Sequence, residues 1–255
     1  MVMILAYILV SVLIVSLISL VGVFTLHMRP KLLDKVLFGM VSFAAGALLA
    51  AAFLDLIPEA MARDPSAIPL WALTGVVVFY MIETFLYWYH CHYGHHHHHS
   101  HHHHMIKPFA WLNLIGDSVH NFVDGMIMAA AYLVSIPLGI TTTLAVIFHE
   151  IPQELGDFGV LVFGGLSSGR ALFYNFLTAL TAFIGALAVY YFSTSVQNLS
   201  IYLVPFAAGG FIYIASADLL PELHKERNLK PAIFQLVLFF FGIAVIWALT
   251  RYVHG

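Results

Sequence analysis

Two imidazoles and two carboxylates stand at helical spacing inside two long apolar stretches of this sequence. His120 and Asp124 are four residues apart. His149 is followed at once by Glu150 and, four residues on, by Gln153. Side chains at i and i+4 share one face of a helix, so each stretch presents a pair that can grip one ion. Imidazole with carboxylate and amide oxygen, and without thiolate, favours borderline ions such as Zn²⁺, Fe²⁺, Co²⁺ or Mn²⁺.

More polar residues continue the same two helical faces. They are Asn113, Asp117 and Asn121 on the first stretch, and Glu154 and Asp157 on the second. An unpaired carboxylate at mid-bilayer costs roughly 2.5–3.5 kcal/mol on insertion scales, so several close together need a cation or an aqueous path. A proton relay is the main functional alternative, and polar contacts between helices are the structural one. We favour metal binding.

The composition places these stretches in a membrane. Hydrophobic residues make up 61% of the chain and charged residues only 9%, too few to cover the surface of a soluble domain of 255 residues. Apolar runs recur at about the 20 residues needed to span a hydrocarbon core. The formal net charge of −3 gives no indication of nucleic acid as a partner. The single cysteine excludes an internal disulfide framework.

Breaks between the apolar runs predict a single all-α transmembrane domain, residues 1–255, with eight spans. Helices are expected because a backbone in lipid must satisfy its own hydrogen bonds. The predicted spans are Val2–Leu26, Leu32–Ile57, Ile68–Tyr89, Pro108–Val134, Leu138–Phe163, Ala171–Phe192, Leu199–Leu220 and Pro231–Tyr252.

Basic residues in the short loops predict the orientation. One side carries Arg29, Lys31, Lys35, Lys107, Arg170, Lys225, Arg227 and Lys230, and the other carries Arg63 and Arg251. The positive side is cytoplasmic by the positive-inside rule, so both termini are expected on the extracytoplasmic side.

An internal repeat predicts a transporter. The motif FAAG, an aspartate nine residues after its glycine, and the pair Pro-Glu three residues later occur twice, at Phe43–Glu59 and Phe206–Glu222. The copies fall on the second and seventh spans, so they cross the membrane in opposite directions. Inverted repeats are typical of transporters that alternate access around a midplane site. Spans one to three would mirror spans six to eight, leaving spans four and five as a central pair.

Two motifs on that central pair resemble the signatures of a known family. HNFVDG at His120–Gly125 resembles HNFxDG, and HEIPQELGD at His149–Asp157 resembles HExPHExGD. Both belong to the ZIP family of zinc and iron transporters. The resemblance covers nearly the whole chain, and it implies a 3+2+3 helical bundle.

The resemblance also implies a set of ligands. His120, Asp124, His149 and Gln153 would surround one transported ion; Asn121 and Glu150 would hold a second position, with Asn175 as an added ligand. Asp55, Glu59, Asp218 and Glu222 would line vestibules or stabilise helix breaks. Position 153 departs from the signature, which has His there. An amide oxygen is a weaker zinc ligand than imidazole, so we expect weaker zinc binding or tolerance of harder ions such as Mn²⁺.

A histidine-rich loop, residues 90–107, lies between the third and fourth spans on the predicted cytoplasmic side. It is too polar and too uniform to pack, so we expect disorder. It would capture or sense metal, and a tolerated low-complexity loop is the alternative.

The function predicted from these features is transport, not catalysis. A divalent metal ion, Zn²⁺ first and Fe²⁺, Mn²⁺, Co²⁺ or Cd²⁺ as alternatives, would enter the cytoplasm by alternating access, with no prosthetic group. A metal-selective channel is one alternative. An intramembrane zinc metalloprotease is another, although its second histidine four residues after His149 is absent. The plasma or inner membrane is expected, with an organelle membrane as the alternative. A homodimer is considered, although no residue pattern indicates one.

Overall fold

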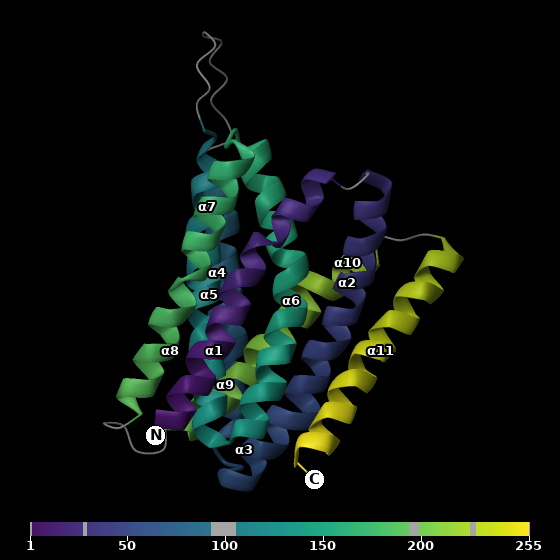
Figure 1. Ribbon diagram of the computed structural model, residues 1–255. Helices are drawn as coiled ribbons and strands as arrows, with labels where there is room; N and C mark the ends of the chain where they lie inside the picture. The colour runs from purple at the N-terminus through teal and green to yellow at the C-terminus, as the bar shows by residue number, and fades with distance from the viewer. Residues whose placement is uncertain (1, 28–29, 93–105, 194–198, 225–227, 255) are drawn as a thin grey trace.

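The described chain is helical from end to end. The computed structural model describes residues 2–27, 30–92, 106–193, 199–224 and 228–254 (Figure 1). Its elements are α1 (Val2–Ile18), the 3₁₀-helix η1 (Ser19–His27), α2 (Pro30–Ala51), the π-helix η2 (Ala52–Leu56), α3 (Ile57–Arg63), α4 (Ile68–His92), α5 (Pro108–Val134), α6 (Ile136–Phe163), α7 (Ser168–Ala179), α8 (Thr181–Phe192), α9 (Leu199–Tyr213), the π-helix η3 (Ile214–Leu219), α10 (Leu220–Leu223) and α11 (Leu229–His254).

The prediction of an all-α membrane protein is confirmed. Five helical stretches are long and apolar enough to cross a membrane: Met3–Thr25, Lys35–Arg63, Ser168–Phe192, Leu199–Leu223 and Leu229–Tyr252. The described part of α4 adds the shorter apolar helix Ile68–Thr84. α5 and α6 do not meet the same criteria, and both carry the polar residues of the candidate site.

Local sequence signals fix the ends of the two central helices. α5 begins with proline, which gives up a donor that the first turn would not use. α6 begins after Ser135, whose side chain accepts a hydrogen bond from the Leu138 amide. It ends where Gly165 adopts φ 101°, and the Leu166 amide donates to the Leu161 carbonyl at 3.1 Å. This is a Schellman stop, which requires a left-handed residue.

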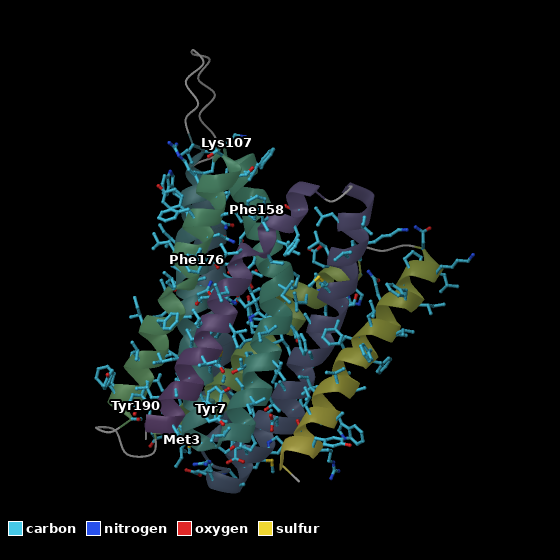
Figure 2. The ribbon with its side chains drawn as sticks, viewed as in Figure 1. Met3, Tyr7, Lys107, Phe158, Phe176 and Tyr190 are labelled. Atoms are coloured by element: carbon cyan, nitrogen blue, oxygen red, sulfur yellow. The ribbon has the colours of Figure 1, made fainter. Side chains whose placement is uncertain are left out.

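Both ends of the chain lie at one end of the bundle. Figure 1 shows N and C together, and it shows the end of α4 and the start of α5 at the opposite end. Figure 2 places Lys107 at that opposite end, and Tyr7 and Tyr190 near the end where the chain begins. An even number of crossings, as predicted, produces this arrangement. The predicted histidine-rich loop lies mostly in 93–105, outside the described residues, while its first three residues end α4.

The predicted repeat has a structural counterpart in two π-helical segments. η2 contains Asp55 and η3 contains Asp218, and each leads into a short helix with proline in its first turn. A π-helical turn is rare and occurs frequently at functional sites.

Three helix pairs pack through reciprocal glycines: α5 with α8, through Gly125 and Gly185, and the two pairs α2 with α11 and α4 with α9. In each pair, a Cβ on either glycine would overlap a carbonyl oxygen three residues before the other glycine. Gly46 faces Phe239 and Gly242 faces Phe43; Gly209 faces Ala72 and Gly75 faces Phe206. Small residues let helix backbones approach closely in a membrane. The two pairs correspond under the predicted inverted repeat, because α2 matches α9 and α11 matches α4. The 3+2+3 grouping itself stays a prediction.

Candidate metal site

Two central helices carry the predicted ligands and pack against each other. α5 presents His120 and Asp124, and α6 presents His149 and Glu150. α8 closes the outer side of α5, where a Cβ on Gly125 would overlap the Ala182 carbonyl oxygen. The glycine of the HNFVDG motif therefore allows a close helix contact directly after Asp124.

Four side-chain atoms from these helices form a compact cluster. His120 Nε2 lies 3.3 Å from His149 Nε2, 3.5 Å from Asp124 Oδ2 and 3.2 Å from Glu150 Oε1. His149 Nε2 lies 3.2 Å from Asp124 Oδ2 and 3.5 Å from Glu150 Oε1. Tetrahedral zinc binds such atoms at about 2.0–2.2 Å, which separates them from one another by roughly 3.3–3.6 Å. The side chains thus hold donor atoms at separations that suit a tetrahedral ion.

A hydrogen bond and burial constrain this tetrad (His120, Asp124, His149 and Glu150). His149 Nδ1 lies 3.2 Å from the Ala145 carbonyl oxygen, which fixes the ring and leaves Nε2 for a ligand. The Asp124 and Glu150 side chains are fully buried. Apart from the two imidazoles, the described part of the chain gives their oxygens no hydrogen-bond donor. Buried carboxylates without donors are costly unless a cation is bound.

Three further carboxylates form a second group. Ligand oxygens of Asp117, Glu154 and Asp157 all lie within 4.8 Å of one another. Glu154 follows Glu150 by one helical turn, about 6 Å along α6, so the two groups adjoin. Glu154 Oε1 and Asp157 Oδ2 are buried and have no hydrogen-bond partner among the described residues. This acidic triad can attract a second cation or a passing one.

Amides and a hydroxyl hold the triad in place. Asn121 Nδ2 donates to Asp117 Oδ1 at 2.8 Å, and Thr178 Oγ1 donates to Asp117 Oδ2 at 2.5 Å. Asn175 Nδ2 donates to Glu154 Oε2 through a short contact. Asn113 Nδ2 donates to Asp157 Oδ1 at 2.9 Å. Asn121 and Asn175 each keep a buried side-chain oxygen without a partner in the described chain, so both remain available as ligands.

The resemblance implies that Glu150 and Asn121 share a second ion position, and this assignment stays a prediction. In the structure, Glu150 lies with the tetrad, and Asn121 is bonded to Asp117 of the triad. Gln153 lies half-buried on the wall of a pocket beside His120 and His149, and no hydrogen bond in the described part ties its amide to them. α6 remains a helix through Pro152, so this proline does not break it.

The predicted ligand set left out Asp117 of the triad and two residues that bond to the triad, Asn113 and Thr178. Asp117 shares a helical face with His120 three residues later, so its spacing was already a signal. Thr178 lies three residues after Asn175 on α7, and its role follows only from the packing of α7 against α5. Glu83 on α4 accepts a short hydrogen bond from Tyr213.

A pocket of about 430 Å³ connects the tetrad to one end of the bundle. Its walls include His120, His149, Asp117, Gln153 and Asp157, and it continues past Glu83, Asp218 and Glu222. Along α5 and α6 these residues lead toward the end where α4 stops and α5 begins (Figure 1). Asp55 takes no part in this pocket. It is buried, and Thr141 donates a short hydrogen bond to its carboxylate.

Together, the fold and the site define an integral membrane protein whose helices surround buried imidazoles and carboxylates. The family model described as "ZIP Zinc transporter" matches residues 2–108 and 90–250, which together make up nearly the whole chain. The chain belongs to the ZIP zinc transporter family, as its two motifs indicated.

Named relatives agree with this assignment. Zinc transporter ZIP13 of Pongo abelii is 32% identical over 230 residues, which cover 84% of this chain and 67% of that protein. Zinc transporter ZIP13 homolog of Drosophila melanogaster is 31% identical over 277 residues, covering 85% and 78%. Zinc transporter ZIP10 of Mus musculus is 36% identical over 156 residues, covering 58% and 19%. These relatives are named as transporters and not as enzymes, which sets the metalloprotease alternative aside.

Proposed function

We propose that this chain carries divalent transition-metal ions, Zn²⁺ first, across a membrane through the tetrad on α5 and α6. The observation that carries the proposal is the geometry of the tetrad. Its two imidazole nitrogens lie 3.3 Å apart, and each lies 3.2–3.5 Å from both carboxylate oxygens. This donor set, which lacks thiolate, suits Zn²⁺ and also admits Fe²⁺, Co²⁺, Mn²⁺ and Cd²⁺. The ion is the substrate, and no prosthetic group is needed.

The pocket and the basic residues support the direction of transport that we propose, which is into the cytoplasm. The pocket leads from the tetrad toward the end that carries Lys35, Lys107, Arg170 and Lys230. By the positive-inside rule that end is cytoplasmic, and the termini are extracytoplasmic. The acidic triad lies on this route and would take the ion from the tetrad on its way to the cytoplasm.

Alternating access is the mechanism we assign to the repeat. Rocking of the repeat-related helices about α5 and α6 would close the pocket on the cytoplasmic side and open an equivalent route outside. We assign the chain to the plasma or inner membrane, and an organelle membrane remains the alternative to test by localisation.

The experiment is Zn²⁺ uptake into proteoliposomes that contain a trapped indicator. We expect saturable uptake by the wild type and a loss of at least tenfold for His149→Ala, because one of four ligands is removed. His224→Ala is the matched control: His224 is exposed at the end of α10, so uptake should be unchanged.

Each other result has a defined meaning. Uptake that rises linearly with zinc concentration would favour a channel over a carrier. Equal uptake by His149→Ala and wild type would contradict the tetrad as the transport site. Absence of flux for Zn²⁺, Mn²⁺ and Fe²⁺ in the wild type would contradict transport altogether.

A further inference from the structure

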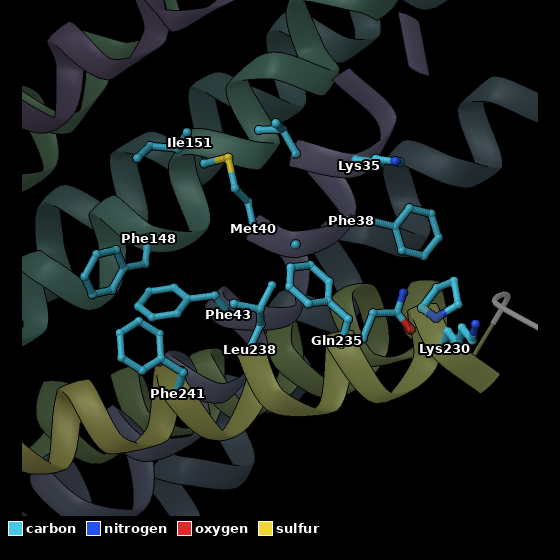
Figure 3. A pocket seen from close by; sticks show the side chains of 14 residues that line it. Lys35, Phe38, Met40, Phe43, Phe148, Ile151, Lys230, Gln235, Leu238 and Phe241 are labelled. Carbon is cyan, nitrogen blue, oxygen red and sulfur yellow. The ribbon is translucent and has the colours of Figure 1, made fainter. Parts of the chain in front are cut away.

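An apolar groove on the outer surface of the bundle is separate from the metal pathway. It has a volume of about 970 Å³ and lies between α2, α6 and α11 (Figure 3). Only 17% of the apolar window of α11 is buried, the lowest share among the five candidate spans, so this side of the bundle faces lipid. The groove is therefore open to a molecule from the bilayer.

The two ends of the groove differ in chemistry. Lys35 and Lys230 lie at one end, where α2 and α11 both begin, and neither lysine has a salt bridge within the described part of the chain. Phe43, Phe148 and Phe241 close the other end (Figure 3). The Phe43 ring lies 4.7 Å from the Phe148 ring and 5.7 Å from the Phe241 ring, measured between centroids. The groove therefore has two lysines at one end and three phenylalanine rings at the other.

The length of the groove matches one leaflet. Lys230 and Phe241 are eleven residues apart on α11, which is about 16 Å along the helix axis. Half of a hydrocarbon core of about 30 Å is about 15 Å. An acyl chain that starts at the lysines would therefore end at the three phenylalanine rings, near the bilayer midplane.

A buried polar group on the groove wall lacks a partner. Gln235 is 5% exposed, and its Nε2 has no hydrogen-bond acceptor among the described residues. Figure 3 shows its amide on the same side of the groove as the lysines. Gln235 follows Lys230 by about 7 Å along α11, so it lies deeper in the groove than the lysines. A buried donor of this kind calls for an acceptor from outside the protein.

The geometry points to a binding site for an anionic glycerophospholipid of the cytoplasmic leaflet. Its phosphate pairs with Lys35 and Lys230, an ester carbonyl accepts from Gln235 Nε2, and an acyl chain fills the groove. Basic pockets between transmembrane helices are suited to such head groups. Phe148 and Ile151 form the α6 wall of the groove. They directly flank His149 and Glu150, so a bound lipid packs against the helix segment that holds the tetrad.

The test uses the full chain in detergent and native mass spectrometry with two lipids of identical acyl chains, phosphatidylglycerol and phosphatidylcholine. We expect wild type to retain phosphatidylglycerol at lower lipid concentration. The double variant Lys35→Ala/Lys230→Ala should lose up to roughly thirtyfold of that preference, since each lysine near the surface contributes separately. Lys107→Ala/Arg170→Ala is the matched control, because it removes two charges at the same end from outside the groove.

A second variant separates binding from folding. Gln235→Leu keeps the side chain's size and removes the unpartnered donor, so it should fold and should lose most of the lipid-dependent rise in melting temperature. Equal retention of both lipids by wild type would overturn the proposal. So would an unchanged preference in the Lys35→Ala/Lys230→Ala variant, or association of two chains in place of lipid adducts. These readouts measure lipid and not zinc, so they do not depend on transport.

Discussion

Glu154 is expected to reduce the stability of the metal-free protein. Its carboxylate shares the triad with Asp117 and Asp157, and the three ligand oxygens lie within 4.8 Å of one another. At an effective dielectric constant of about 20, two unit charges 4.8 Å apart repel by about 3 kcal/mol. Glu154→Gln removes that charge and keeps an oxygen for the Asn175 amide, which now donates to Glu154.

We therefore expect Glu154→Gln to stabilise the metal-free protein by up to about 3 kcal/mol at a pH high enough to ionise all three carboxylates of the triad. The two like-charge pairs of Glu154 would give more, but the amides and the hydroxyl bonded to Asp117 and Asp157 already offset part of the repulsion. Such a gain raises the melting temperature by roughly 6–12 °C for a chain of this size. The same change should reduce the further rise that Zn²⁺ produces, because a cation has one charge fewer to neutralise.

Thermal unfolding in detergent, followed by tryptophan fluorescence with EDTA and with Zn²⁺, measures both effects. Glu59→Gln is the control: Glu59 pairs with Arg63 at 2.9 Å on the surface, so its loss should change stability by less than about 1 kcal/mol. A lower melting temperature for Glu154→Gln in EDTA, with an unchanged zinc-induced rise, would refute the triad as a repulsive cation site.

Two further predictions concern the same helices. Gln153→His should raise zinc affinity about tenfold and slow zinc release, because an imidazole replaces an amide on the pocket wall beside the tetrad. Equilibrium zinc binding measures the affinity and the maximal uptake rate measures the release. Unchanged values would count against the reasoning. Gly46→Val should lower the free energy of unfolding by at least about 3 kcal/mol or prevent folding, because the Cβ would overlap the Phe239 carbonyl oxygen. Gly156→Ala is the control and should be tolerated in the same thermal assay, because nothing lies within 4 Å of a Cβ there. Equal melting temperatures for the two variants would contradict the close packing of α2 and α11.

Much of the fold was predictable, because hydropathy and the residues that start and stop helices act over short stretches of sequence. The prediction Pro108–Val134 coincides with α5, since a proline opens it and Ser135 follows it. The second and seventh spans are longer than predicted, reaching Arg63 and Leu223, because the repeat's prolines open new helical turns where a break was expected.

The site was predictable in its residues and less so in its grouping. Spacing identifies which side chains share a face of one helix, but the offset between two packed helices decides which faces meet. Glu150 therefore joins His120 and His149 across the contact between α5 and α6. The hydrogen bond from Asn121 to Asp117 lies within α5, at a four-residue spacing that the sequence already shows. A sequence pattern also cannot reveal that Thr178 on another helix bonds the same carboxylate.

The two copies of the repeat differ in a way that suits alternating access. Asp55 and Asp218 are equivalent in sequence, and both lie in a π-helical segment. Asp55 is buried and bonded to Thr141 on α6, whereas Asp218 is exposed and lines the pocket. Under the inverted repeat that we propose, the two aspartates would lie on opposite sides of the membrane, with the Asp55 side closed and the Asp218 side open. In the state that we propose opens outward, the roles would exchange: Asp55 would leave Thr141 and meet water, and the pocket around Asp218 would close.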